Sequence, residues 1–186
     1  MNSIHLRKKN TTKWFRDLRN LICKDFEYFE NNNAKKKIKF TRSKWKKSKI
    51  KSEGGGEISI LRNGNIFEKV GVNISVVNGR FDKNFKNKIP GTKKSSKFWA
   101  SGISVVAHFQ NPKIPSLHFN TRYIITSKEW FGGGMDVTPC IKDDKQKKYF
   151  HQELKKMCFN HDKNYYKIHK LNCDKYFFLP HRNEPR

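Results

Sequence analysis

The spacing of hydrophobic residues changes along the chain from a helical period to an alternating one. Between residues 14 and 29 the apolar side chains recur at helical intervals, which predicts an amphipathic helix buried on one side, with Thr11 or Thr12 as its cap. The apolar positions of this helix are Trp14, Leu18, Leu21, Ile22, Phe26 and Phe29. The lysine-dense segment 31–52 has no clear period, and we interpret it as an exposed connector.

The middle of the chain has the alternation that is typical of short strands. The segment "EISILRNGNIFEKVGVNISVV" contains Asn63-Gly64, which is a strong hairpin signal. Two more predicted strands, "ASGISVVAHF" and "SLHFNTRYII", follow a polar stretch at 79–97. Helical spacing returns in "KDDKQKKYFHQELKKMCF" and in a last helix that breaks at Pro180. This order of elements predicts an α+β fold with an antiparallel sheet.

Composition restricts the class of partner more than the fold. The 186 residues are one domain by size, or part of a larger one. Their net charge of +25 suggests an anionic partner such as nucleic acid, a membrane surface or a polycarboxylate. Most of the lysines are scattered, which favours a solvated surface over a designed binding face. The chain contains no apolar run of membrane-spanning length and no secretory signal, so we expect a cytoplasmic protein without an integral membrane segment.

The cysteines agree with that expectation. Cys23, Cys140, Cys158 and Cys173 show neither a CxxC spacing nor a regular disulfide framework. We therefore expect free thiols in a reducing compartment.

Candidate chemistry gathers on the two strands that flank "QNPKIP". Because side chains alternate between the faces of a strand, Ser104 and His108 share one face of the first strand, and His118, Asn120 and Arg122 share one face of the second. If the strands pair as a hairpin, these polar groups lie together. Lysine is absent from both strands although it is abundant elsewhere. A ligand cleft and an ordinary solvated sheet face both remain open at this point.

The stretch "EWFGGGMDVTP" sets three consecutive glycines before Asp136. Glycine loses much backbone freedom on folding, so a run of it within an apolar segment suggests close approach of a ligand to the backbone. A plain flexible loop, with Asp136 as a turn or cap residue, is the alternative.

Several of these segments together resemble a known family. "EGGGEISILRNGNIFEKVGVNISVVNG", "ISVVAHFQNPKIPSLHFNTRY", "WFGGGMDVTP", "KYFHQELKKMC" and "CDKYFFLPHRNEPR" occur in the order found in oxygen-dependent coproporphyrinogen III oxidases. The resemblance covers roughly residues 53–186, which we separate as an oxidase-like portion from a basic helix and connector at 1–52.

The resemblance implies a broad antiparallel β-sheet flanked by helices, with the substrate cleft over the sheet, in a homodimer. It implies oxidative decarboxylation of two propionates of coproporphyrinogen III to vinyl groups, giving protoporphyrinogen IX in heme biosynthesis. Molecular oxygen is the co-substrate and no organic cofactor is used, which agrees with the lack of a dinucleotide or phosphate-loop motif in the sequence.

The same resemblance implies roles for individual residues. Arg122 offers a planar guanidinium suited to a propionate carboxylate, and Asp136 can accept pyrrole N–H bonds or take a proton. By resemblance, substrate is bound by Ser104, Asn120, Thr121 and Arg122, the catalytic groups are His118 as proton donor and Asp136, and a divalent metal is held by His108, His118, His151 and His181. The glycines Gly132, Gly133 and Gly134 are expected to turn the chain tightly under the macrocycle.

The sequence also departs from the family pattern. Glu129 stands where a second tryptophan is common, and the chain stops where the family continues into further strands. We therefore expect a fold that lacks its C-terminal part. A truncated non-catalytic remnant is one alternative to an active oxidase. A basic nucleic-acid-binding module is another, although the scattered charge and the absence of a reading motif speak against a nucleic-acid partner.

Overall fold

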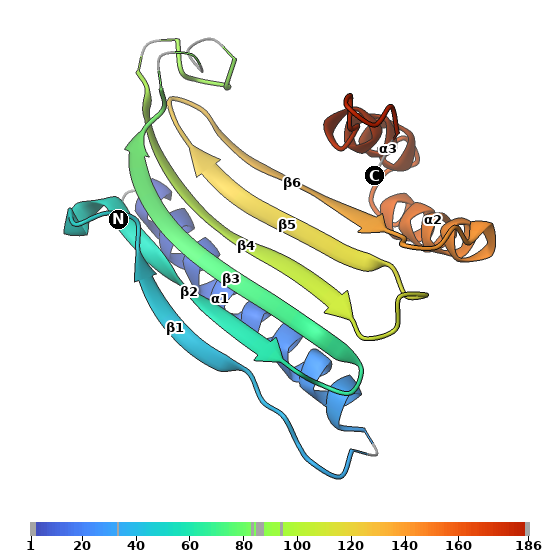
Figure 1. Cartoon of the computed structure of the whole chain (residues 1–186). Coiled ribbons are helices and arrows are strands. Elements are labelled where there is room, and N and C mark those ends of the chain that lie inside the picture. The colour runs from blue at the N-terminus through green and yellow to red at the C-terminus, as the bar shows by residue number, and fades with distance from the viewer. Residues whose placement is uncertain (1–2, 33, 83, 85–87, 94, 185–186) are drawn as a thin grey trace.

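The protein is an α+β structure built on a single sheet, as expected (Figure 1). The computed structural model describes residues 3–32, 34–82, 84, 88–93 and 95–184. Six antiparallel strands follow one another across the sheet in chain order from β1 to β6. The elements are α1 (Ser3–Asn31), β1 (Thr41–Lys46), the 3₁₀ turn η1 (Lys51–Glu53), β2 (Gly54–Arg62), β3 (Phe67–Arg80), β4 (Lys97–Phe109), β5 (Ser116–Ile125), β6 (Glu129–Thr138), α2 (Asp144–Phe159) and α3 (Tyr165–Tyr176).

Both predicted hairpins are present. In the β2–β3 turn, the Asn63 N–H donates to the Glu68 carbonyl at 3.0 Å and the Gly64 N–H donates to the Phe67 carbonyl at 2.9 Å. Asn63 has a φ of 56°, in the left-handed region that asparagine tolerates better than most residues. In the β4–β5 hairpin, Val106 pairs with His118, so the alternating faces coincide as the sequence predicts.

The segment expected to be an exposed connector contains an edge strand. Residues 41–46 form β1, which pairs with β2 throughout its length. Its side chains are mostly exposed because the strand lies at the edge of the sheet. The strand therefore has no buried apolar positions, and its sequence shows no alternation of apolar and polar residues. The connector interpretation was wrong for these six residues.

Helix α1 covers one face of the sheet, and the buried core lies between them (Figure 1). The core residues are Phe15, Cys23, Leu61, Phe67, Val70, Val72, Ile103, Val105, Ala107 and Tyr123. The predicted helix exists, but it begins at Ser3, so Thr11 and Thr12 lie inside it and do not cap it. The predicted buried face was also partly wrong, since Trp14, Leu21 and Phe29 are more than half exposed.

The buried face of α1 differs from the predicted one because two charged residues of the helix have partners on the sheet. The Arg19 side chain is 4% exposed and pairs with Glu57 through Nη1 and Oε1 at 2.5 Å, and it also donates to Ser59 Oγ at 3.2 Å. The Glu30 carboxylate accepts backbone N–H bonds from Ile66 at 3.2 Å and from Phe67 at 3.0 Å. Buried charges are tolerated when they are paired in this way, so hydrophobic spacing alone cannot identify the buried face.

Glu129 ties β6 to the first helix. Its carboxylate pairs with Arg7 of α1 at 2.8 Å and accepts a hydrogen bond from the buried Tyr123 hydroxyl. The Tyr123 bond, with the Arg7 guanidinium, lowers the pKa of Glu129. Burial, followed by the Glu129 bond, raises the pKa of Tyr123.

The last two helices lie beside β6, away from α1 (Figure 1). As predicted, α2 occupies the segment after the glycine run, and its N-terminus is capped by Asp143, which accepts from Lys145 N–H at 3.0 Å and Gln146 N–H at 2.9 Å. Helix α3 ends at Tyr176, before Pro180. The two helices contact each other, and α3 contacts β6. Within the part of the chain that the structure describes, no helix is long and apolar enough to cross a membrane.

Candidate active site on the open face of the sheet

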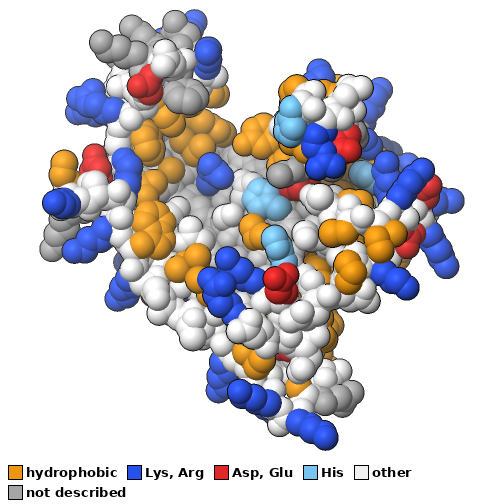
Figure 2. Space-filling view, in the orientation of Figure 1, with side chains coloured by type: hydrophobic (Ala, Val, Ile, Leu, Met, Phe, Trp, Pro, Cys, Tyr) orange, Lys and Arg blue, Asp and Glu red, His pale blue; other side chains and the backbone are white. Residues whose placement is uncertain are grey.

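The polar residues singled out in the sequence share the face of the sheet opposite α1. Strand pairing aligns Ser104 with Asn120, and His118 with Asp136. Since directly paired residues of an antiparallel sheet lie on the same face, one surface carries Ser104 and His108 from β4, His118, Asn120 and Arg122 from β5, and Asp136 from β6. Figure 2 views this surface and shows histidine side chains gathered near its middle, between hydrophobic side chains. We call this surface the open face.

His118 and Asp136 form the central pair of the open face. His118 Nδ1 lies 2.9 Å from Asp136 Oδ1, and the Asp136 side chain is only 6% exposed against 31% for His118. A carboxylate at Nδ1 orients the imidazole and leaves Nε2 for another partner. The Phe177 ring, just beyond α3, meets the His118 ring edge-on with centroids 6.1 Å apart. This arrangement can hold the imidazole in one orientation while it exchanges a proton.

Arg122 lies two rows further along the open face, beyond Asn120. Its guanidinium is exposed, and Nη2 donates to Asn120 Oδ1 at 3.2 Å. Its paired neighbours on both sides, Gly102 and Gly132, have no side chains. The remaining guanidinium N–H groups therefore have space to bind a planar anion. A guanidinium offers a carboxylate two parallel N–H donors, which a lysine ammonium does not.

The three glycines do not form the tight turn that the sequence predicted. All of them lie within β6, and the described glycines with positive φ are elsewhere, at Gly54 and Gly91. Gly132 and Gly134 face the open side, where they leave the sheet bare next to Arg122 and Asn120. A methyl group on Gly134 would lie 3.6 Å from the Phe177 ring. The glycine run therefore supplies a flat surface, and its effect on ligand access comes from missing side chains.

Thr121 is not brought to the open face. It alternates with Asn120 and Arg122 along β5 and pairs with Ile103, whose side chain belongs to the core against α1. Its hydroxyl lies 3.5 Å from the Gly132 carbonyl. Any contact between this residue and a ligand on the open face would have to use the main chain.

The four histidines implied as metal ligands are not gathered either. His108 and His118 lie on neighbouring strands, His151 lies on α2 and His181 is exposed after α3. His151 Nδ1 is 3.2 Å from the Tyr166 hydroxyl, and burial, followed by nearby lysines, lowers the pKa of His151. Among the described residues, no three His, Cys, Asp or Glu side chains form a group that could hold a metal ion. These positions therefore do not fit one metal site, and we derive no step through a metal.

Three residues of the open face were missed in the sequence. Asn73 on β3 pairs with Ser104, and its Oδ1 accepts a hydrogen bond from Trp45 Nε1 at 2.8 Å. Phe177 covers His118 and Gly134. The sequence could have indicated Asn73, because it is a polar residue between apolar ones in a predicted strand. Nothing in the sequence pattern indicates Trp45, because it lies in the edge strand β1, which the pattern does not reveal.

These observations define the class of protein first. It is an α+β protein with one antiparallel sheet, whose polar face opposite α1 carries groups able to hold a carboxylate and to move a proton. Comparison with known sequences then identifies the family. The family model described as coproporphyrinogen III oxidase matches residues 10–186, and the chain belongs to this family.

Curated relatives agree with this assignment. The chain is 48% identical over 183 residues to the oxygen-dependent coproporphyrinogen-III oxidase of Rickettsia rickettsii (strain Sheila Smith), covering 96% of this chain and 64% of that relative. It is 48% identical over 188 residues to the protein of the same name from Rickettsia bellii (strain OSU 85-389), covering 97% of this chain and 66% of the relative. The chain therefore spans about two thirds of the length of these relatives.

Proposed function

We propose that this chain acts in the oxidative decarboxylation of coproporphyrinogen III to protoporphyrinogen IX, with O2 as the oxidant and no organic cofactor. Family membership supports this proposal, and the relatives are named oxygen-dependent coproporphyrinogen-III oxidases. The observation that carries it is the presence of Arg122 and the His118–Asp136 pair on the same open face of the sheet.

The substrate would lie flat against the sheet where side chains are missing. Gly102, Gly132 and Gly134 present backbone to the open face, so a planar ring system can approach closely. One propionate would bind the Arg122 guanidinium, and Ser104 and Asn120 would offer it further polar contacts. Phe177 would form the wall of the site above His118.

Each conversion removes CO2, one proton and two electrons from a propionate, and O2 takes up the electrons. His118 would exchange protons with the substrate through Nε2, while the buried Asp136 carboxylate holds Nδ1 and stabilises the charged imidazole. In this arrangement Asp136 acts mainly by positioning His118. Its predicted direct contact with the pyrrole N–H groups remains a prediction.

The proposal extends to the setting of the reaction. As the resemblance implies, the protein would work in the cytoplasm as a homodimer, without a nucleic-acid partner. Exposed large apolar side chains on α1, among them Trp14, Leu21 and Tyr28, support a subunit contact. Sedimentation of the purified chain measures this directly, and a monomer at all accessible concentrations would contradict the dimer.

The activity is tested with reduced substrate. The purified chain is incubated with coproporphyrinogen III in air and under argon, alone and with a polypeptide corresponding to the remaining third of the Rickettsia rickettsii relative. Chromatography should show protoporphyrinogen IX in air only, and Arg122→Gln should lose it. Porphyrin binding without any oxygen-dependent product, in both arrangements, would favour a non-catalytic remnant.

A further inference from the structure

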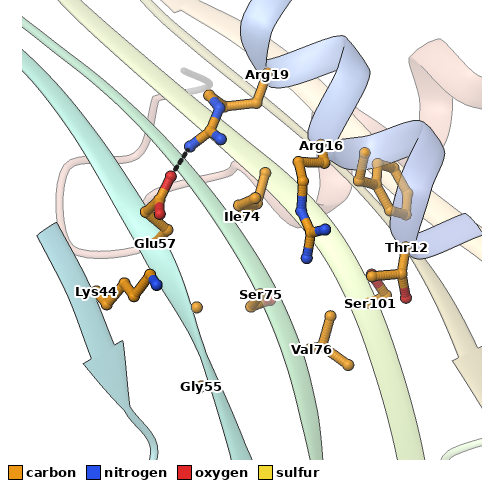
Figure 3. Close-up of a pocket in the computed structure, with 12 residues that line it drawn as sticks. Thr12, Arg16, Arg19, Lys44, Gly55, Glu57, Ile74, Ser75, Val76 and Ser101 are labelled. Carbon is orange, nitrogen blue, oxygen red and sulfur yellow. Dashed lines mark hydrogen bonds and ion pairs between the residues drawn. The ribbon is translucent and has the colours of Figure 1, made fainter. Parts of the chain in front are cut away.

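A cavity lies on the opposite side of the sheet from the candidate active site. It occupies about 470 Å³ between α1 and strands β1 to β4 (Figure 3). This volume is within the range of small-molecule sites, which is about 300–1,000 Å³. Its apolar walls come from Phe15 of α1 and from Ile74 and Val76 of β3. None of the residues implied by the family resemblance lines this cavity.

The charged lining of the cavity has an excess of positive charge. Arg16, Arg19 and Lys44 line it together with one carboxylate, Glu57, which pairs with Arg19 at 2.5 Å. Arg16 extends from α1 over β3, and Lys44 extends from β1 toward the same space (Figure 3). Neither Arg16 nor Lys44 makes an ion pair within the described residues. Two cations at one cavity mouth, next to an apolar wall, suit an organic anion.

A buried hydroxyl at the far side of the cavity provides an independent observation. Ser101 of β4 is 1% exposed and lines the cavity, yet its Oγ has no hydrogen-bond partner among the residues that the structure describes. Leaving a buried hydroxyl without a partner is costly, so such groups are usually satisfied by protein, water or ligand. Thr12 of α1 adds a second hydroxyl to the lining.

We propose that this cavity binds a small organic carboxylate, with the carboxylate held by Arg16 and Lys44 and the apolar body lying on Phe15 and Ile74. The Arg16 guanidinium provides paired N–H donors for the two carboxylate oxygens. Ligands that carry a polar atom at the other end can also reach Ser101 Oγ, and those without one are held by the carboxylate and the apolar walls alone. The site is separate from the open face, and its occupancy does not depend on the proposed oxidase activity.

Calorimetric titration of the 186-residue chain with benzoate tests this site. Benzoate should bind saturably with a Kd of about 1 mM or tighter, and its neutral analogue benzamide should bind at least about tenfold more weakly. Arg16→Gln or Lys44→Gln should weaken benzoate binding by about tenfold, because each removes a charge-assisted contact. Both side chains are exposed, so both variants should unfold at the wild-type temperature.

Two controls make the result specific. Lys46→Gln removes the same charge from the same strand, outside the cavity lining, and should leave benzoate binding unchanged. Arg122→Gln removes the carboxylate-binding group of the open face and should also leave it unchanged. Loss of binding in Arg122→Gln with retention in Arg16→Gln would overturn the proposal, as would equal binding of benzoate and benzamide or the absence of saturable binding.

Discussion

Substitutions in the glycine run of β6 can perturb the stability of the fold and the open face separately. A methyl group on Gly133 would lie 2.3 Å from the Asn120 carbonyl oxygen and 2.9 Å from Thr121 Cα, both of them main-chain atoms of β5. A methyl group on Gly132 would meet its nearest neighbour, the Trp130 indole, at an ordinary 3.7 Å. Gly133→Ala therefore forces β5 and β6 apart, whereas Gly132→Ala does not.

The size of this contrast follows from packing and backbone entropy. Overpacking of this kind costs about 1–3 kcal/mol, while replacing glycine in an extended strand stabilises by about 0.5–1 kcal/mol. The entropy gain is common to both variants, so Gly133→Ala should be about 1–3 kcal/mol less stable than Gly132→Ala. Urea unfolding followed by tryptophan fluorescence measures both free energies of unfolding.

A larger substitution at Gly132 tests whether the open face binds the porphyrin. Gly132→Leu places a side chain on the open face next to Arg122, so it should fold like Gly132→Ala. It should bind coproporphyrin III, the fluorescent oxidised form of the proposed substrate, at least about tenfold more weakly. If Gly132→Leu binds the porphyrin as wild type does, the flat surface is not the binding surface. Equal stability of the two alanine variants would refute the packing argument.

Two further predictions concern the contacts between α1 and the sheet. Glu30→Ala should lower the free energy of unfolding by about 3–5 kcal/mol because it leaves several N–H groups of the β2–β3 turn without their acceptor. Chemical denaturation measures this free energy. The control Asp25→Ala removes an exposed carboxylate of the same helix and should change the free energy of unfolding by less than about 0.5 kcal/mol. The Arg19 hydrogen bond lowers the pKa of Glu57 below its ordinary 4.5, so the pair contributes stability above that pH, and this contribution is lost as pH falls through the folded-state pKa. Glu57→Gln should therefore flatten the acid limb of the stability curve, measured by calorimetry, as the pH falls below the ordinary pKa of a glutamate. An unchanged acid limb would show that Glu57 titrates alike in both states.

The arrangement of the open face could be predicted from the sequence because it depends on local rules. Alternation placed Ser104, His118 and Arg122 on single faces of their strands, and a hairpin of adjacent strands then brings those faces together. Asp136 joins them because β6 pairs with β5 in a register that sets it opposite His118. Strand β6 follows β5 directly after residues 126–128, but its glycine run has no alternation of apolar and polar side chains, so the sequence did not reveal it as a strand.

The features that were missed depend on tertiary partners. The buried face of α1 includes Arg19 and Glu30, whose burial is favourable only because Glu57 and the β2–β3 turn satisfy them. Strand β1 has no hydrophobic pattern because it lies at the sheet edge. A glycine run has the same appearance in sequence whether it forms a turn or a bare strand, and pairing with β5 decides between them.

A structure of the chain with coproporphyrin III bound tests the central claim most directly. The account predicts a tetrapyrrole lying on the open face over Gly132 and Gly134, with one propionate on the Arg122 guanidinium and His118 Nε2 within hydrogen-bond distance of the ligand. A porphyrin seated in the cavity beneath α1, or on the lysine-rich surface away from His118 and Arg122, would contradict it.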